Sequence, residues 1–213
     1  MINNNLVVFD LDGTLNRTEL YAVPAHKKAL AEYGITNITD EQIISHFGAR
    51  IKDCLKFYFG RELSQAEETE YLKRSGTYEN EFMVDNHGEY DGITDMLKTL
   101  RQNGYKTAVC SNASERYIRL VLSTLNILQY IDFIQPLLEG LHKQDTLKIL
   151  VQSVNPEKCV MVGDRIYDKN AATANNIPFI GCAYGFNKEE ILDADAVVYT
   201  ASEIPSAVKN LIG

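Results

Sequence analysis

The chain lacks any excess of basic residues. It contains 21 lysines and arginines against 29 aspartates and glutamates, and its formal net charge at pH 7 is -8. Proteins that bind nucleic acids or anionic membrane surfaces present a basic footprint, which this composition does not supply. We therefore expect a small-molecule partner, with no nucleic acid and no membrane among the ligands.

Long apolar runs are absent as well. No stretch approaches the roughly 18 apolar residues that a membrane-spanning helix requires. The polar start Met1-Ile2-Asn3-Asn4-Asn5 has no basic region of the kind found in secretion signals. Both observations favour a cytoplasmic location. With 213 residues, 45% of them hydrophobic, the chain is long enough to bury a sizeable core.

Cysteine is scarce and widely spaced. The four cysteines form no Cys-x-x-Cys pair, and the four histidines are scattered without the spacing of a zinc motif. Three of the cysteines fall in or beside apolar segments that we expect to be buried strands, where a thiol behaves as a small hydrophobe. We predict buried free thiols at Cys54, Cys110, Cys159 and Cys182 and no zinc site.

The most informative segment is the opening run Leu6-Val7-Val8-Phe9-Asp10-Leu11-Asp12-Gly13-Thr14-Leu15. Four apolar residues followed by two acids and a glycine predict a buried strand whose carboxyl end carries two carboxylates. Because side chains alternate along a strand, Asp10 and Asp12 are expected on the same side. Two like charges that close together are costly unless a cation or a proton offsets their repulsion. The run therefore indicates a metal, acid-base chemistry, or both.

Residues 16–88 have helical patterns and no convincing strand. We predict helices over 20–33, from 39, over 50–59, and from 64 to 83 with an interruption near Gly76. Segments 39–42 and 64–67 have the Ser/Thr-x-x-Glu/Gln spacing of capping boxes.

Residues 89–213 alternate between helices and apolar strands. We predict helices over 93–103, 114–125, 144–154, 168–175 and 205–211, and strands over 105–110, 133–134, 159–163, 178–181 and 196–199. Strands that are apolar throughout indicate a parallel sheet covered on both faces. The predicted fold class is α/β: a doubly wound, Rossmann-like parallel sheet of residues 1–15 and 89–213, with residues 16–88 inserted as a helical cap domain.

Polar residues follow the predicted strands where ligands bind in such sheets, outside the carboxyl ends. Carboxylates come from the first and third core strands and from one turn beyond the third, and hydroxyl, amide and ammonium donors come from elsewhere: Asp10, Asp12, Asp164, Asp168, Ser111, Asn112 and Lys143. Oxygen ligands suit Mg²⁺. Donors and Mg²⁺ around a carboxylate suit phosphoryl transfer, where charge on the transferred group must be neutralised.

Four segments in this order resemble the motifs of the haloacid dehalogenase superfamily of phosphohydrolases, in the branch with a helical cap after the first motif. They are residues 10–15, residues 111–112, Lys143, and residues 163–168. The resemblance covers essentially the whole chain. It implies a Mg²⁺-dependent phosphatase of a small phosphorylated metabolite, near phosphoglycolate phosphatase in general type, and we expect a monomer or weak dimer.

The resemblance also implies roles for the acidic residues. Asp10 is similar to the nucleophile that forms an aspartyl-phosphate, and also to a metal ligand. Asp12 is similar to the general acid-base, with its backbone carbonyl on the metal. Asp164 corresponds to a direct metal ligand, and Asp168 to the carboxylate that supports the metal or its waters.

Other residues are implied in substrate binding. Ser111 and Lys143 correspond to the groups that hold the transferred phosphoryl, and Gly13 and Asn112 to residues that shape the phosphate pocket. In the cap, Arg50 of the loop 47–50 is the recognition candidate, because its guanidinium binds anionic groups in bidentate fashion.

Simpler interpretations stay open for several of these residues. Asp10-x-Asp12-Gly13 alone is often a turn, Ser111-Asn112 and Asp168 are also suited to helix capping, and Arg50 is also suited to solvent. Lys148 is the alternative to Lys143, His142 is expected at the surface, and Arg17 is expected in a surface ion pair. The aromatic residues of the insertion are expected to form cap core rather than a substrate platform: Phe57, Tyr58, Phe59, Tyr71 and Tyr78.

Three other functions are less consistent with the sequence. A sugar phosphomutase similar to β-phosphoglucomutase has the same core and cap, but carries a cap histidine where this chain has Ala22, with His26 one turn further on. A true dehalogenase lacks the second acid, which is present here as Asp12. A non-catalytic phosphate-binding protein is disfavoured because no motif is broken. The chain departs from the family pattern at Arg17, Asp91 and Gln144, which weakens any assignment of a substrate.

Overall fold

The computed structural model describes residues 4–213, so the first three residues of the polar start lie outside the described part. The chain divides into two compact units. One comprises Met1–Asn16 and Glu89–Gly213, and the other comprises Arg17–Gly88. Within residues 4–213 no helix is both long and apolar enough to cross a membrane.

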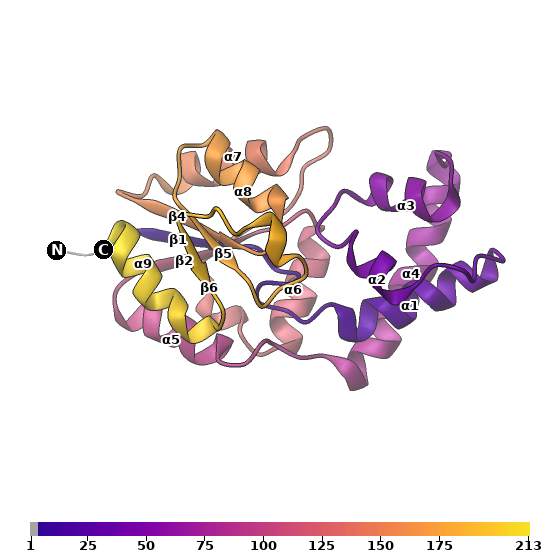
Figure 1. The fold of residues 1–213 in the computed structure, drawn as a ribbon, viewed down its shortest axis with the longest axis horizontal. Helices are drawn as coiled ribbons and strands as arrows, with labels where there is room; N and C mark the ends of the chain where they lie inside the picture. The colour runs from indigo at the N-terminus through magenta and orange to yellow at the C-terminus, as the bar shows by residue number, and fades with distance from the viewer. Residues whose placement is uncertain (1–3) are drawn as a thin grey trace. The chain divides into compact units, whose positions relative to one another are not determined.

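The first unit is built on a six-stranded sheet (Figure 1). Its strands are β1 (Leu6–Phe9), β2 (Lys106–Cys110), β3 (Phe133–Gln135), β4 (Cys159–Gly163), β5 (Phe179–Cys182) and β6 (Ala196–Val198). The strand order is β3-β2-β1-β4-β5-β6, and every neighbouring pair is parallel. The expected parallel α/β sheet is confirmed, and β1, which carries the opening run, lies between β2 and β4.

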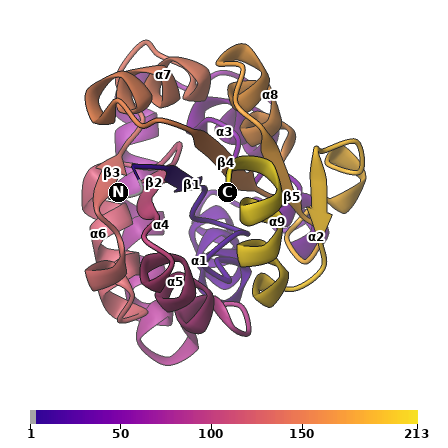
Figure 2. The same ribbon diagram turned by 90° about the vertical axis from the view of Figure 1, so that its left-hand side faces the viewer.

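Helices cover both faces of this sheet. They are α5 (Ile93–Gln102), α6 (Glu115–Thr124), α7 (Lys143–Val154), α8 (Ile166–Ala174) and α9 (Ile204–Ile212), with three 3-10 turns, η1 (Leu128–Tyr130), η2 (Lys188–Glu190) and η3 (Ala201–Glu203). Helices α7 and α8 pack together over one face, and α5 and α9 lie over the other (Figures 1 and 2). The apolar strands are buried because both faces are covered.

Alternation along β1 decides which helices each of its side chains meets. Leu6 and Val8 belong to the core cluster that also contains Leu147 of α7 and Ala171 of α8. Val7 and Phe9 are equally buried and, by alternation, face the other side. The next residue on the Leu6 and Val8 side is Asp10, so the strand directs this carboxylate towards α7 and α8.

The second unit is all-helical within residues 17–88, as the sequence predicts. It consists of α1 (Glu19–Glu32), α2 (Asp40–Ile44), α3 (Ile51–Phe59) and α4 (Gln65–Asn86), and α1 packs against α4. The capping boxes at Thr39 and Ser64 are both formed. The assignment of this unit as a cap stays a prediction.

Two details of the predicted helices are wrong. Helix α4 runs without a break through Gly76, because a single glycine weakens a helix but does not end it when the flanking turns are intact. Helix α8 begins at Ile166, two residues before the expected start, so Asp168 lies in its first turn and is not its N-cap. The four cysteines are buried and free, as predicted.

Candidate active site

The site is centred on Asp10, the residue that follows β1. Its backbone N–H donates to the carbonyl of Val162 in β4 at 2.8 Å, so the ladder holds the chain in place beyond the last strand residue. The side chain is almost fully buried, with 3% of the residue exposed. A buried carboxylate needs partners that compensate for lost hydration.

Lys143 supplies the positive partner. It is the first residue of α7, and its Nζ lies 2.5 Å from Oδ1 of Asp10 and 2.6 Å from Oδ1 of Asp168. Only 6% of this lysine is exposed, whereas Lys148, the alternative, is exposed. The structure therefore places Lys143, and not Lys148, between two of the predicted acids.

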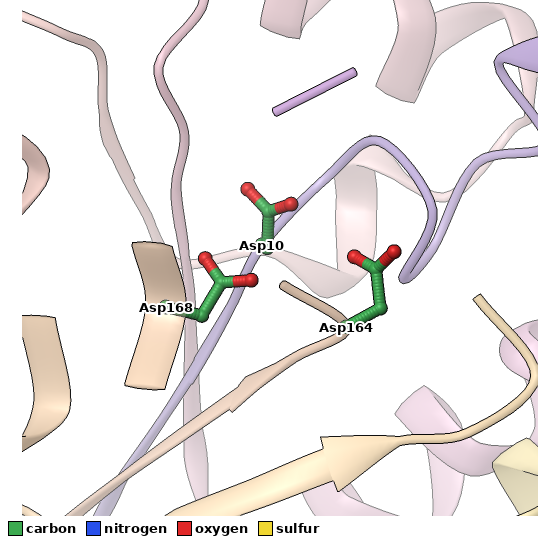
Figure 3. Close-up of side chains that lie close together, drawn as sticks. All are labelled: Asp10, Asp164 and Asp168. Carbon is green, nitrogen blue, oxygen red and sulfur yellow. The ribbon is translucent and has the colours of Figure 1, made fainter. Parts of the chain in front are cut away.

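Asp164 and Asp168 complete a group of three carboxylates. Each of Asp10, Asp164 and Asp168 offers an oxygen within 4.8 Å of the other two. Figure 3 shows the three side chains arriving from the segment after β1, the end of β4 and helix α8. The expectation that residues at the carboxyl ends of separate strands lie together is met for Asp10 and Asp164, and Asp168 of α8 lies with them.

Hydrogen bonds orient Asp164 and Asp168 within the group. Oδ1 of Asp164 accepts from the Thr14 hydroxyl at 3.1 Å, and its Oδ2 accepts from the Phe186 backbone N–H at 2.8 Å. Oδ2 of Asp168 accepts from the Arg165 backbone N–H at 3.0 Å. Both side chains are essentially inaccessible to solvent.

Burial and mutual repulsion alter the acid strength of the group. Burial, with a further contribution from the charge of Asp168, raises the pKa of Asp10 to about 7, while Lys143 acts in the opposite direction. Burial, together with Asp168 and Asp10, raises the pKa of Asp164 well above its ordinary value. Burial alone disfavours the Lys143 ammonium, but Asp10 and Asp168 outweigh it and raise its pKa. Lys143 is therefore positively charged, but its single charge does not balance the negative charge of the carboxylates around it.

The net charge of the group indicates whether it suits a divalent metal. When all three carboxylates are ionised, they and the single ammonium leave an excess of two negative charges in a group that is almost completely buried. A divalent cation with oxygen ligands would remove that excess. The donor set is carboxylate oxygen throughout, without sulfur or imidazole, and it suits a hard cation such as Mg²⁺.

Asp12 is not one of the three clustered carboxylates. It is half-buried, and its Oδ1 accepts from Nδ2 of Asn16 and from the hydroxyl of Tyr117, both at 3.0 Å. Because β1 ends at Phe9, the expectation that Asp10 and Asp12 share one side stays a prediction. The charge that most affects the pKa of Asp10 is that of Asp168, with Asp12 last among the contributors. A metal contact through the Asp12 backbone carbonyl stays a prediction.

The remaining core candidates lie at the expected chain positions. Ser111 follows β2, is 3% exposed and accepts a hydrogen bond from the Ala113 backbone N–H at 3.1 Å, while Asn112 is half-buried. Gly13 has φ +87°, and a Cβ there would lie 2.4 Å from Oδ2 of Asp164. The Asp-Gly step is thus both a turn, as the simpler interpretation held, and a close contact with the carboxylate group.

The candidates in the helical unit have local partners. Arg50 is exposed at the N-cap of α3 and pairs with Asp53 at 3.1 Å, and Arg17 pairs with Glu19 at 3.0 Å. A recognition role for Arg50 stays a prediction. Tyr58 and Tyr71 are buried in the unit, but Phe57 is 40% exposed, so the expected aromatic core is only partly formed. His142 is exposed, as expected.

Several contact residues escaped the sequence-based analysis. Thr14 lies inside the first motif, and its closeness to Asp10 and Asp12 in the sequence was the one feature that could have indicated a role for it. Tyr117, Phe186 and Glu190 lie far along the chain from the residues they contact. Only the fold brings them together, so no local pattern could have indicated them.

Comparison with known proteins is consistent with this geometry. A family model described as haloacid dehalogenase-like hydrolase matches residues 7–182. The chain belongs to this family. It is 27% identical over 219 residues to phosphoglycolate phosphatase of Nitrosospira multiformis, covering 95% of each chain. It is 27% identical over 209 residues to 5'-nucleotidase of Pseudomonas aeruginosa, covering 93% of this chain and 91% of that one.

A solved structure extends the likeness to the fold of the whole chain. The β-phosphoglucomutase structure from Clostridium difficile has a TM-score of 0.80 at 21% identity, and the match covers 99% of this chain and 96% of that one. At this identity the likeness shows the fold alone. The expectation of a phosphatase-type hydrolase of the haloacid dehalogenase-like family is confirmed at the level of family and enzyme class.

Proposed function

We propose that the protein is a Mg²⁺-dependent phosphatase of a small phosphorylated metabolite and works through an aspartyl-phosphate on Asp10. The observation that carries the proposal is the buried contact of Lys143 with both Asp10 and Asp168, beside Asp164. A nucleophilic carboxylate held by an ammonium, next to a cation-binding set of acids, suits attack on an anionic phosphate.

The proposed reaction has two steps. In the first, an Asp10 carboxylate oxygen attacks phosphorus, the ester P–O bond breaks, and the leaving alkoxide takes a proton from Asp12. In the second, Asp12 takes a proton from water, the resulting hydroxide attacks phosphorus, and the bond between phosphorus and the Asp10 oxygen breaks to release phosphate. Asn16 and Tyr117 donate to Asp12 and would orient it for both transfers.

Other residues would balance the charges of Asp10 and of the phosphoryl group. Lys143 favours the ionised form of Asp10, which burial disfavours. Asp10, Asp164 and Asp168 would hold Mg²⁺, which supplies positive charge to the phosphoryl oxygens when bound. Ser111, Asn112 and the turn at Gly13 would line the phosphate pocket. The cytoplasmic location and the state of monomer or weak dimer stay predictions.

The surroundings of His26 disfavour the alternative of a sugar phosphomutase. Its Nδ1 lies 2.7 Å from the Tyr71 hydroxyl, its Nε2 lies 3.6 Å from Oε1 of Glu79, and only 8% of the residue is exposed. A buried imidazole with partners inside its own helical unit is poorly placed to exchange protons with a sugar. Hydrolysis is therefore the preferred reaction.

A substrate screen tests the proposal. With Mg²⁺, we expect the purified protein to hydrolyse a generic phosphate monoester such as p-nitrophenyl phosphate. A panel should then include phosphoglycolate, nucleoside 5'-monophosphates and sugar monophosphates, the last with and without a bisphosphate sugar activator. Release of inorganic phosphate supports a phosphatase, whereas isomerisation that depends on the activator would show a mutase.

The matched variants for this screen are Asp10→Asn and Asp95→Asn. Asp10→Asn should abolish hydrolysis while leaving the circular dichroism spectrum unchanged. Asp95 is exposed on α5, so its asparagine variant should retain full activity. Substantial turnover by Asp10→Asn would contradict the assignment of the nucleophile.

A further inference from the structure

A second, partly buried ion pair lies directly beside the three-carboxylate group. Nε of Arg165 is 2.9 Å from Oε2 of Glu190, and Nη2 is 3.3 Å from Oε1. The arginine side chain is 4% exposed and that of Glu190 is 24% exposed. In this bidentate pair the two hydrogen bonds fix the orientation of the guanidinium relative to the carboxylate as well as the distance between them.

Arg165 occupies the turn that joins two of the proposed metal ligands. It directly follows Asp164, and its backbone N–H donates to Oδ2 of Asp168 at 3.0 Å. The next residue, Ile166, begins α8 and donates its backbone N–H to Oε2 of Glu190 at 2.9 Å. The Glu190 carboxylate therefore holds the turn by both a side chain and a backbone group.

The segment that carries Glu190 also touches Asp164 directly. The Phe186 backbone N–H donates to Oδ2 of Asp164 at 2.8 Å. A Cβ at Gly185 would lie 2.3 Å from the Asp164 Cβ, so this backbone packs tightly on the carboxylate. Asn187 in turn donates to Oε1 of Glu190 at 2.9 Å. Residues 185–190 thus support Asp164 at one end and the Asp168 turn at the other.

We infer that Glu190 is a positioning residue for the divalent-cation site, acting through Arg165 and the Ile166 amide to set the separation of Asp164 and Asp168. The inference rests on the proposed function, since it supposes that those acids hold Mg²⁺. Partners that orient metal ligands commonly change metal affinity by about 10- to 100-fold when removed. Glu190 lies outside every segment that the sequence analysis singled out, and it touches neither substrate nor metal in this account.

The test is calorimetric titration of the purified protein with Mg²⁺, without substrate. We expect Glu190→Gln to weaken Mg²⁺ binding about 10-fold or more, because the neutral amide no longer balances the Arg165 guanidinium. Glu189→Gln is the matched control, since Glu189 is the exposed neighbour in the same 3-10 turn; its affinity should equal that of the unaltered protein. In assays, Glu190→Gln should raise the Mg²⁺ concentration for half-maximal rate while kcat at saturating Mg²⁺ changes less than about twofold.

The outcomes separate the two proposals. If the unaltered protein binds no Mg²⁺, the proposed function fails. If the unaltered protein binds Mg²⁺ and folded Glu190→Gln binds it equally well, only the positioning role is overturned. Should Glu190→Gln not fold, Arg165→Lys decides, because it retains the charge opposite Glu190 but loses the bidentate pair: weaker Mg²⁺ binding supports the inference, and unchanged binding overturns it.

Discussion

At the scale of single residues, the site depends on how one lysine is shared. Lys143 contacts both Asp10 and Asp168 within a buried space, and its charge opposes the protonation that burial imposes on Asp10. Removal of one partner from a buried ion pair leaves an uncompensated charge, which is more damaging than loss of a surface pair. Lys143 should therefore matter for stability as well as for catalysis.

Replacement of Lys143 by methionine tests this view. We expect Lys143→Met to lower kcat/KM at least about 100-fold, the cost typical of losing one fixed electrostatic partner of a transition state. It should also lower the free energy of unfolding by about 3–5 kcal/mol. Lys148→Met, an exposed lysine on the same helix, should change neither quantity. Steady-state kinetics and urea unfolding of both variants measure the effects, and equal behaviour of the two would contradict the account.

The acidic residues of the site could be predicted from the sequence because they follow apolar runs. Asp10 follows one apolar run, and Asp164 and Asp168 follow another, so their positions in the chain indicate a shared edge of the sheet. The partners of these acids could not be found in that way. Tyr117, Phe186 and Glu190 reach the site only through contacts between residues distant in the chain.

At the scale of secondary structure, helix boundaries depend on caps and glycines. The capping box at Ser64 could be predicted from the sequence, because its two side chains bond two backbone N–H groups at a fixed spacing of three residues. The start of α8 was misjudged because Arg165 has no capping hydroxyl or carboxylate; its N–H is instead satisfied by Asp168, three residues on. Gly76 suggested a break that packing of α4 against α1 overrides.

The continuity of α4 gives a prediction about Gly76. No atom lies within 4 Å of a Cβ built at this position, and its φ is not in the left-handed region. Gly76→Ala should therefore raise the free energy of unfolding by about 0.5–1 kcal/mol, because alanine loses less backbone entropy in a helix.

Gly34 is the matched control for Gly76. It also has open space around its Cβ position, but it follows α1 with φ +76°. Gly34→Ala should lower the free energy of unfolding, by about 1 kcal/mol, because a Cβ is strained in that region. Urea unfolding measures both variants. A destabilised Gly76→Ala would show that α4 is not a continuous helix at this residue.

At the scale of the whole molecule, alternation of helix and strand signals was sufficient to predict the fold class. Apolar strands spaced by helical segments indicated a covered parallel sheet, and the sheet order follows the doubly wound scheme. The all-helical character of residues 17–88 was also predictable, since no β pattern occurs there. Which side chains of that unit are buried was not, because aromatic residues such as Phe57 and Tyr58 look alike in sequence.

Buried His26 makes the stability of the molecule depend on pH. Burial lowers its pKa from 6.5 to about 4, even though Glu79 lies 3.6 Å away. Between these values the unfolded chain binds a proton that the folded chain does not, so the free energy of unfolding should fall as pH falls from about 6.5 to about 4. The expected slope is at most about 1.4 kcal/mol per pH unit.

Urea unfolding between pH 7.5 and 4.5 measures this dependence. Compared with the unaltered protein, His26→Gln should show a shallower loss of stability on acidification. His142→Gln, which alters an exposed histidine, should retain the original slope. The same slope in His26→Gln and in the unaltered protein would contradict the assignment of a neutral buried imidazole.

The central claim is that the phosphoryl group passes through Asp10, and trapping the intermediate tests it most directly. Asp12→Asn, which lacks the proposed base for the second step, would be mixed with Mg²⁺ and p-nitrophenyl phosphate, whose p-nitrophenolate leaves without a proton from Asp12, and then quenched in acid and digested for mass spectrometry. We expect one added phosphoryl group on the peptide that contains Asp10, and none on that peptide in the Asp10→Asn/Asp12→Asn variant. Phosphoryl transfer to a different residue, or full-rate hydrolysis by the double variant, would contradict it.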